Sequence, residues 1–282
     1  MSSHVFNQSS KSTASPASPS AIVDQIVAGW QAVQDSTPLV QCLTNTVVQP
    51  LTANVLIAGG AAPAMVDVVG EAEVFAAIAS GVLINLGTVA PGQQAAMPVA
   101  AQAAHENGTP WVLDPVAIGA LPVRTNLAHT LTAFQPTVVR GNASEIIALS
   151  GGVGGRGVDS TASVEEAADA ARAVAEKTCG VVAVSGEVDL ITDGSTEIRC
   201  VNGSPMLTQI TGAGCSLGAY ITAFVATIED PVIATAAAHV CFGIAGERAA
   251  QKASGPGTFG VYLLDEIANL NADIIRAEAK LP

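Results

Sequence analysis

Short apolar runs alternate with longer Ala-rich segments along the first two thirds of the chain, and this alternation limits the possible folds more than any other feature. The runs are almost continuously apolar, which is typical of parallel strands in a sheet covered on both faces. The pattern therefore predicts an α/β fold with a mostly parallel, doubly wound sheet between layers of helices. The predicted strands are Leu39–Leu43, Ala64–Val68, Val82–Leu86, Trp111–Asp114, Thr137–Arg140 and Val181–Ser185.

The intervening segments have helix length, and the last third of the chain changes character. A short antiparallel hairpin is predicted there, with strands Asp189–Thr192 and Glu197–Val201 and a turn at Asp193–Gly194. Three helices are expected after it. The predicted helices are Val47–Ala58, Glu71–Ala79, Pro91–Glu106, Asn126–Phe134, Ala143–Leu149, Ser163–Lys177, Ala213–Thr227, Pro231–Lys252 and Gly260–Ala279.

The charge balance excludes two classes of partner. Lys and Arg number 11 against 24 Asp and Glu, a net charge of −13, and no cationic side chain lies between Lys11 and Arg124. Nucleic acids and anionic membrane surfaces both require clusters of Lys or Arg, so neither is expected to bind. The long uncharged stretches are interrupted by Pro, Gly and amide residues, which excludes a membrane span. We expect them to be buried in the core and between subunits.

The N-terminus and the cysteines indicate one cytoplasmic domain. Residues 1–20 are rich in Ser and contain Pro16 and Pro19, which predicts a disordered extension before a single domain over residues 21–282. The five cysteines form no CxxC pair, so neither a zinc site nor a disulfide framework is indicated. A signal peptide is not apparent. The glycine-rich stretch Gly151–Gly157 is interpreted as a flexible surface loop.

The segment Ile210–Ser216 carries the strongest local signal for function. Its Thr-Gly-Ala-Gly sequence opens an apolar helix, where backbone N–H groups can converge on an anion such as phosphate. The plainer interpretation is a tight turn with a helix cap. Cys215 lies in the first helical turn, where the helix dipole is expected to favour a thiolate. It is a candidate proton acceptor or a polar wall for a substrate hydroxyl.

Two acidic residues and one arginine follow predicted strands, at the edge where open α/β sheets bind ligands. Asn142 and Glu145 have capping-box spacing, so Glu145 is either a structural cap or part of a metal–water cluster. Asp114 precedes a proline and is expected to point over the sheet edge. Asp114 and Glu145 together suit a Mg²⁺ ion held through waters, beside a phosphate bound by Arg140.

Six motifs in one order resemble the hydroxyethylthiazole kinase family, and the likeness covers roughly residues 21–280. They are Leu43–Asn45, Pro63–Met65, Leu113–Pro115, Arg140–Glu145, Ser185–Asp189 and Thr211–Cys215. The resemblance implies a ribokinase-like three-layer sandwich. It also implies transfer of phosphate from ATP to the hydroxyl of 4-methyl-5-(2-hydroxyethyl)thiazole with Mg²⁺, in a homotrimer whose active sites lie between subunits.

The same resemblance implies roles for individual residues. The thiazole side of the site comprises Met65, Gly212 and Asn45. The ATP side comprises Arg140, Ser185 and Thr211, with Ser185 at a position that is often Thr in the family. Asp114 and Glu145 match the acidic pair near the metal. The catalytic turn comprises Gly212, Gly214 and Cys215, and Cys215 matches the position at which other ribokinase-like enzymes carry an Asp base.

Two other functions remain compatible with the residues alone. One is an ATP- or ADP-dependent dehydratase of hydrated nicotinamide nucleotides, which requires a wide polar pocket; Met65 and the Ala-rich segments favour a small apolar one. The other is a non-catalytic nucleotide-binding or thiazole-sensing protein. The presence of Asp114, Glu145 and the glycine turn favours an enzyme.

Overall fold

A computed structural model describes residues 18–152 and 162–282 of the chain. In these residues eight strands form one sheet in the order β2-β1-β3-β4-β5-β6-β7-β8. All pairs from β2 to β6 are parallel, and β7 and β8 extend the sheet as an antiparallel hairpin. The strands are β1 (Leu39–Leu43), β2 (Ala62–Ala64), β3 (Gly81–Asn85), β4 (Trp111–Asp114), β5 (Val138–Asn142), β6 (Val181–Ser185), β7 (Asp189–Thr192) and β8 (Glu197–Cys200).

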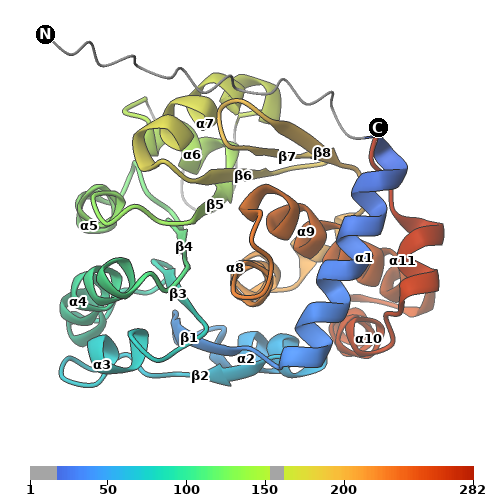
Figure 1. Ribbon diagram of the computed structural model, residues 1–282, viewed down its shortest axis with the longest axis horizontal. Coiled ribbons are helices and arrows are strands. Elements are labelled where there is room, and N and C mark those ends of the chain that lie inside the picture. The colour runs from blue at the N-terminus through green and yellow to red at the C-terminus, as the bar shows by residue number, and fades with distance from the viewer. Residues whose placement is uncertain (1–17, 153–161) are drawn as a thin grey trace, which may run out of the picture.

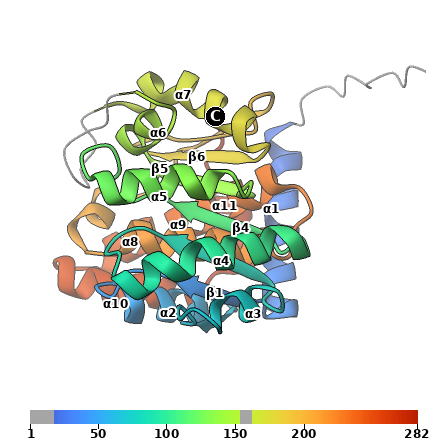
Figure 2. The same cartoon turned by 90° about the vertical axis from the view of Figure 1, so that its left-hand side faces the viewer.

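Helices cover both faces of the sheet, as Figures 1 and 2 show. One face carries α3 (Ala72–Ala76), α4 (Pro91–Asn107), α5 (Pro122–Thr132), α6 (Ala143–Leu149) and α7 (Val164–Thr178). The other carries α1 (Pro19–Ser36), α2 (Gln49–Ala58), α8 (Ala213–Val225), α9 (Pro231–Lys252), α10 (Pro256–Ala268) and α11 (Ala272–Glu278). The predicted three-layer α/β architecture is thus confirmed.

Each face of the sheet has its own hydrophobic core, because successive side chains of a strand point to opposite faces. Cys42 and Val112 pack among the helices of the α8 and α9 face, whereas their neighbours Leu43 and Leu113 pack among those of the α4 face. These strands are apolar on both sides for that reason. Within the described ranges, none of the helices is long and apolar enough to cross a membrane.

The edge strand β2 differs from its prediction. It covers Ala62–Ala64, not Ala64–Val68, and pairs with β1 through Leu39 and Ala62. The chain then leaves the sheet, and Val68 is 59% exposed. The apolar run Ala64–Val68 therefore predicted the wrong position for β2, because Val68 lies on the exposed surface of the chain and not in the sheet.

Two helical regions were also predicted wrongly. Helix α1 (Pro19–Ser36) was not predicted at all, and it begins inside the expected extension, where the Ser18 side chain caps its first turn. Residues 1–17 lie outside the described chain. The predicted helix Gly260–Ala279 is two helices, α10 and α11. The break comes where the Asn271 side chain accepts hydrogen bonds from the amides of the next helix.

A 3₁₀ turn, η1 (Pro205–Gln209), was not predicted. The proposed glycine loop falls mostly in residues 153–161, outside the described residues.

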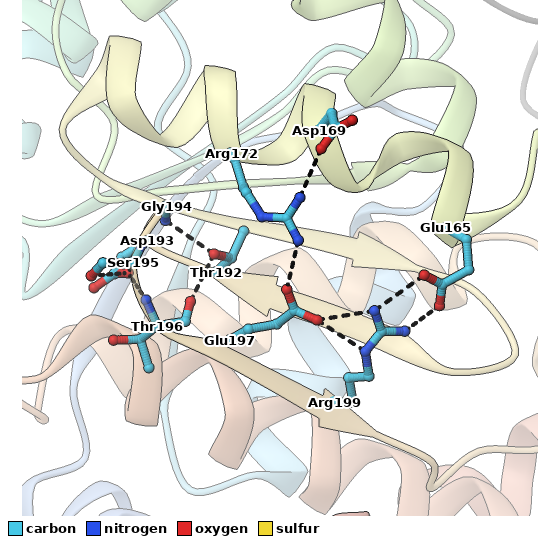
Figure 3. A network of polar contacts seen from close by, with 10 residues as sticks. All are labelled: Glu165, Asp169, Arg172, Thr192, Asp193, Gly194, Ser195, Thr196, Glu197 and Arg199. Carbon is cyan, nitrogen blue, oxygen red and sulfur yellow. Dashed lines mark hydrogen bonds and ion pairs between the residues drawn. The ribbon is translucent and has the colours of Figure 1, made fainter. Parts of the chain in front are cut away.

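Ion pairs fasten α7 to the β7–β8 hairpin, as Figure 3 shows. Arg172 on α7 contacts Asp169 and Glu197, and Arg199 on β8 contacts Glu197 and Glu165. The hairpin turn is closed by hydrogen bonds to the Asp193 carboxylate. The hairpin pairs with β6, so this network supports the strand that ends at Ser185.

Candidate active site

Polar side chains from five neighbouring parallel strands meet at the carboxyl edge of the sheet. Asn85 and Asp114 end β3 and β4, and the strand register places them directly opposite each other. Asn45 lies two residues beyond the end of β1, and Ser185 ends β6. Arg140 is the middle residue of β5, and its long side chain reaches Ser185 at this edge. The N-terminus of α8 packs over this row, since α8 contacts β1, β3 and β4.

A chain of hydrogen bonds joins the thiol of Cys215 to the carboxyl of Asp114. The Asn45 Nδ2 group donates to Cys215 Sγ at 3.5 Å and to Asn85 Oδ1 at 2.9 Å. Asn85 Nδ2 in turn donates to Asp114 Oδ2 at 2.6 Å. Asn85 was missed by the sequence analysis, although its place at the end of an apolar strand was a usable signal. It links two candidates that come from distant parts of the chain.

Arg140 connects the same row to the start of α8. Its Nε and Nη2 groups donate to Ser185 Oγ at 3.1 and 2.9 Å, and its Nη1 lies 3.9 Å from Asp114 Oδ1. A Cβ atom placed on Gly214 would lie only 2.8 Å from Arg140 Nη1. Gly214 is therefore required for the close approach of the guanidinium to the helix, and the arginine and the helix dipole together make this place electropositive.

Gly212 allows the sharp entry into α8. Its φ of +89° is the left-handed conformation that glycine adopts most easily, and a Cβ atom there would lie 2.6 Å from Val48 Cγ1. The first helical hydrogen bond runs from the Ser216 amide to the Gly212 carbonyl at 2.8 Å. The amides in the first turn before Ser216 have no acceptor within the helix, which is the geometry that binds anions. Thr211 lies exposed just before this turn.

The expectation that Cys215 is a thiolate is wrong. Burial, and secondarily the nearby Asp114 carboxyl, raises the pKa of the Cys215 thiol to about 11. Arg140 and the amides of Asn85 and Asn45 lower this pKa, but less than burial raises it. The helix dipole favours the thiolate, but the loss of water around the buried thiol outweighs it. At neutral pH the group is a protonated thiol.

The two acidic candidates differ in their surroundings. Burial raises the pKa of Asp114 to about 7, while Arg140 lowers it. Burial also raises the pKa of Glu145, against the effect of hydrogen bonds from the backbone. Both oxygens of Glu145 accept amide hydrogens, one from Ala117 at 2.9 Å and one from Asn142 at 2.8 Å. The capping box is confirmed, so Glu145 has a structural role whatever else it does.

The donor set fits a metal ion only if water supplies most of its ligands. In the part of the chain that the structure describes, no three or more His, Cys, Asp or Glu side chains gather closely enough to hold a metal. Asp114 Oδ1, however, is buried without a hydrogen-bond partner. A carboxylate oxygen that makes no hydrogen bond, beside an anion site, suits Mg²⁺, which keeps several waters when bound next to phosphates.

Met65 lies at the same edge of the sheet, one residue after β2. It is partly buried and packs against the core on the α8 and α9 face. Asn45, Cys215, Asp114, Arg140 and Ser185 are thus joined by direct contacts or through Asn85. Met65 has no such link among the residues that the structure describes; Gln93 instead connects the residue before Asn45 with a residue two positions after Met65, donating to the Thr44 carbonyl and to Asp67, each at 2.8 Å. Gln93 was missed by the sequence analysis.

Sequence comparisons place the chain among enzymes of one kind. A model of the hydroxyethylthiazole kinase family matches residues 30–273. A hydroxyethylthiazole kinase of Kineococcus radiotolerans is 54% identical over 254 residues, 90% of this chain and 92% of that protein. One of Clavibacter sepedonicus is 56% identical over 250 residues, 88% of this chain and 91% of that protein.

Solved structures agree with the sequence matches. The hydroxyethylthiazole kinase of Pyrococcus horikoshii has a TM-score of 0.85 and 37% identity, over 92% of this chain and 98% of that one. A pyridoxal kinase of Staphylococcus aureus in complex with ADP has a TM-score of 0.58 and 18% identity, over 76% of this chain and 89% of that one. The second likeness shows a shared ribokinase-like fold.

Proposed function

The chain belongs to the hydroxyethylthiazole kinase family, and we propose that the carboxyl edge of its sheet binds ATP and transfers its terminal phosphoryl group to the hydroxyl of 4-methyl-5-(2-hydroxyethyl)thiazole. The observation that carries this assignment to particular residues is the contact of Arg140 with the start of α8, beside Asp114 and Cys215. A cation and free helix amides at one point form a site for a transferring phosphate.

Phosphoryl transfer depends on positioning and on neutralising charge more than on a strong base. Arg140 and the first amides of α8 bind the phosphate, and Ser185 fixes the orientation of the guanidinium. Thr211 lies beside these amides on the ATP side. Because the thiol is protonated, we assign Cys215 to positioning the substrate hydroxyl. Its sulfur accepts the Asn45 N–H, which orients the group.

Mg²⁺ is part of the proposal. Bound beside the phosphates, it neutralises the charge that develops on them. Asp114 has a buried oxygen without a hydrogen bond to hold the waters of the ion, and Glu145 is close enough to act on Asp114 electrostatically. The like charge of Glu145 adds to the raised pKa of Asp114, so a bound cation relieves an unfavourable pair.

On the thiazole side we propose Asn45, Met65 and Gly212. These residues come from the ends of β1 and β2 and from the turn before α8, on the side of Cys215 away from Arg140's strand. Apolar and amide groups suit a small neutral heterocycle, for which a charged pocket is unnecessary. A dehydratase of hydrated nicotinamide nucleotides finds no support in the family match.

We further propose a homotrimer with active sites between subunits. Exposed apolar side chains occur on the elements around the edge strand β2: on the segment that carries Met65, on α3 and just after it, and on α2. They are Val68 (59% exposed), Val69 (50%), Val74 (62%), Ile78 (68%) and, on α2, Ile57 (62%). A cluster of this kind is typical of an interface between proteins. We assign it to a second copy of the chain.

The remaining parts of the proposal concern the chain as a whole. We propose that residues 21–282 act as one kinase domain, and that the enzyme works in the cytoplasm, where cysteines stay reduced. All five cysteines are free, which agrees with that compartment. Nucleic acid and membranes are not proposed as partners, because the net charge is −13.

A direct assay tests the function. Purified protein is mixed with Mg-ATP and the thiazole alcohol, other vitamin-precursor alcohols or hydrated NADH, and ADP release is followed while mass spectrometry detects the phosphorylated product. We expect thiazole phosphate as the main product. Folded protein that makes no thiazole phosphate above the no-enzyme control would refute the proposal, and consumption of hydrated NADH would support the dehydratase instead.

A further inference from the structure

The segment between β2 and α3, residues 65–71, carries Met65 and is fastened by side chains from other elements. It contains bends and turns but no strand or helix. The amide of Glu71 donates to the Val68 carbonyl within the segment, and the Gly70 amide donates to Glu73 in α3. The contacts that tie it to the rest of the site come from two buried glutamines.

Gln41 lies in the middle of β1 and is completely buried. Its Nε2 group donates to the Val66 carbonyl at 2.8 Å, near the start of the segment, and to the Ala72 carbonyl at 3.0 Å, in the first residue of α3. Its Oε1 atom is buried without a partner. Burial of an amide in a core strand is unfavourable unless its groups are paired. Both N–H groups of Gln41 are used to hold residues 66–72 against the sheet.

Gln93 lies in the first turn of α4 and is 5% exposed. Its Nε2 group donates to the Thr44 carbonyl and to Asp67 Oδ2, both at 2.8 Å. Its Oε1 atom accepts the Ala90 amide at 3.4 Å, at the start of α4. Since this acceptor faces the backbone of its own helix, the two donors are directed at two other segments. One of these precedes Asn45 and the other follows Met65.

We propose that Gln93, supported by Gln41, is a positioning residue for the alcohol substrate: its amide fixes the separation between Asn45 and Met65, and so the width of the thiazole side of the site. This inference rests on the proposed function, which places the thiazole between these two residues. Gln93 acts through the backbone of Thr44 and the side chain of Asp67, and does not itself touch the substrate.

Gln93→Glu tests the inference. This substitution replaces the donor with an acceptor that faces the Thr44 carbonyl and the Asp67 carboxylate. We expect KM for the thiazole alcohol to rise about tenfold or more, the effect of losing one hydrogen bond to a charged group. KM for ATP should change less than twofold. Gln94→Glu, the same charge change one residue further along α4 at an exposed position, should leave both constants unchanged.

Two further measurements separate positioning from a general loss of stability. Asp67→Asn combined with Gln93→Glu restores a donor–acceptor pair, so KM for the thiazole should recover by more than half of the increase on a logarithmic scale. Hydrogen exchange of the peptide over residues 62–72 should speed up in Gln93→Glu and slow again in the double variant. Circular dichroism and thermal melting establish that each variant is folded.

The outcomes are distinct. Equal rises in both KM values, or no rescue by Asp67→Asn, would overturn the positioning role. Unchanged hydrogen exchange over residues 62–72 in Gln93→Glu would show that Gln93 does not hold this segment. This result counts even if the parent protein proves inactive on the thiazole. A parent protein that does not phosphorylate the thiazole alcohol refutes the proposed function, and with it the substrate named in this inference. The exchange measurement still decides whether Gln93 holds the segment.

Discussion

The side chains of Asn45 and Cys215 meet at the site although 170 positions separate them in the sequence, with Asn45 Nδ2 lying 3.5 Å from Cys215 Sγ. The amide hydrogen occupies a lone pair of the sulfur. The pKa of the thiol, raised to about 11, keeps the S–H proton in place at neutral pH. Cys215 thus presents a weak, oriented hydrogen-bond donor at the start of α8, next to the proposed phosphate site.

Substitution of Cys215 separates positioning from proton transfer. Cys215→Ala should lower kcat by about a hundredfold, at the low end of the effect of a general base, with KM for ATP little changed. Cys215→Asp should remain active, because a carboxyl group of similar reach can also contact the hydroxyl. Steady-state kinetics check both variants. Parent-like turnover of Cys215→Ala would mean that the thiol contributes nothing to the reaction.

Arg140→Ala should weaken the use of ATP more than the binding of the thiazole. A charge-assisted contact between arginine and phosphate is worth about 1.5–3 kcal/mol, so KM for ATP should rise roughly ten- to hundredfold. Arg276→Ala removes an exposed arginine on α11 and serves as the control. An unchanged KM for ATP in folded Arg140→Ala protein would show that Arg140 only supports Ser185 and Asp114.

Asp114 should make the ligand-free protein less stable as pH rises. Burial raises its pKa from 3.8 to about 7, so the folded state holds a proton that the unfolded chain has already released between these values. The free energy of unfolding therefore falls from about pH 4 to pH 7 and above, by at most about 4 kcal/mol from this group. Asp114→Asn removes this dependence.

Denaturant unfolding without Mg²⁺ or ATP checks this expectation. Asp114→Asn and the parent should be similarly stable at pH 4, and the variant should be the more stable at pH 8 while losing kinase activity. A variant that is less stable than the parent at pH 8 contradicts the assignment of a buried, unfavourable carboxylate.

The apolar cluster beside β2 should hold the trimer together. Light scattering of the parent at micromolar concentration should give about three times 28.2 kDa. Val74→Glu places a charge in the proposed interface and should produce smaller species with reduced activity. Val123→Glu makes the same change on α5, at a position that is 53% exposed but away from the cluster, and should stay trimeric. An active monomeric parent would refute the proposal.

The sequence predicted the central strands well because each had to satisfy two apolar surfaces at once. Strands β1, β4, β6 and β7 have the predicted bounds. Strand β3 begins and ends one residue earlier than predicted. Strand β5 begins one residue later and ends two residues later, at Asn142. Strand β2 failed because its apolar continuation at Val68 and Val69 faces outward. An apolar run in the sequence does not distinguish a buried strand from an exposed apolar loop, since single apolar side chains are common on protein surfaces.

The candidate site was predicted as far as its residues follow strands or open a helix. Asp114 and Ser185 end their strands, and the Arg140 side chain reaches both from the middle of β5. The glycines at 212 and 214 are required by φ or by close approach. The ionisation of Cys215 was wrong, because the sequence does not show that Asp114 and a dry environment surround the thiol. Gln41 and Gln93 were not predicted as site residues. Their hydrogen-bond partners include backbone carbonyls of other segments, and such contacts leave no motif in the sequence.

Helix α1 packs on α9 and α11, so the first described helix depends on the last. Ile26 and Val33 on α1 are completely buried in that core. While the chain is being synthesised, these side chains emerge from the ribosome long before the surface that covers them exists. The nascent chain must therefore keep α1 unpartnered through most of translation, and a product cut short before α11 leaves an apolar stripe exposed to aggregation.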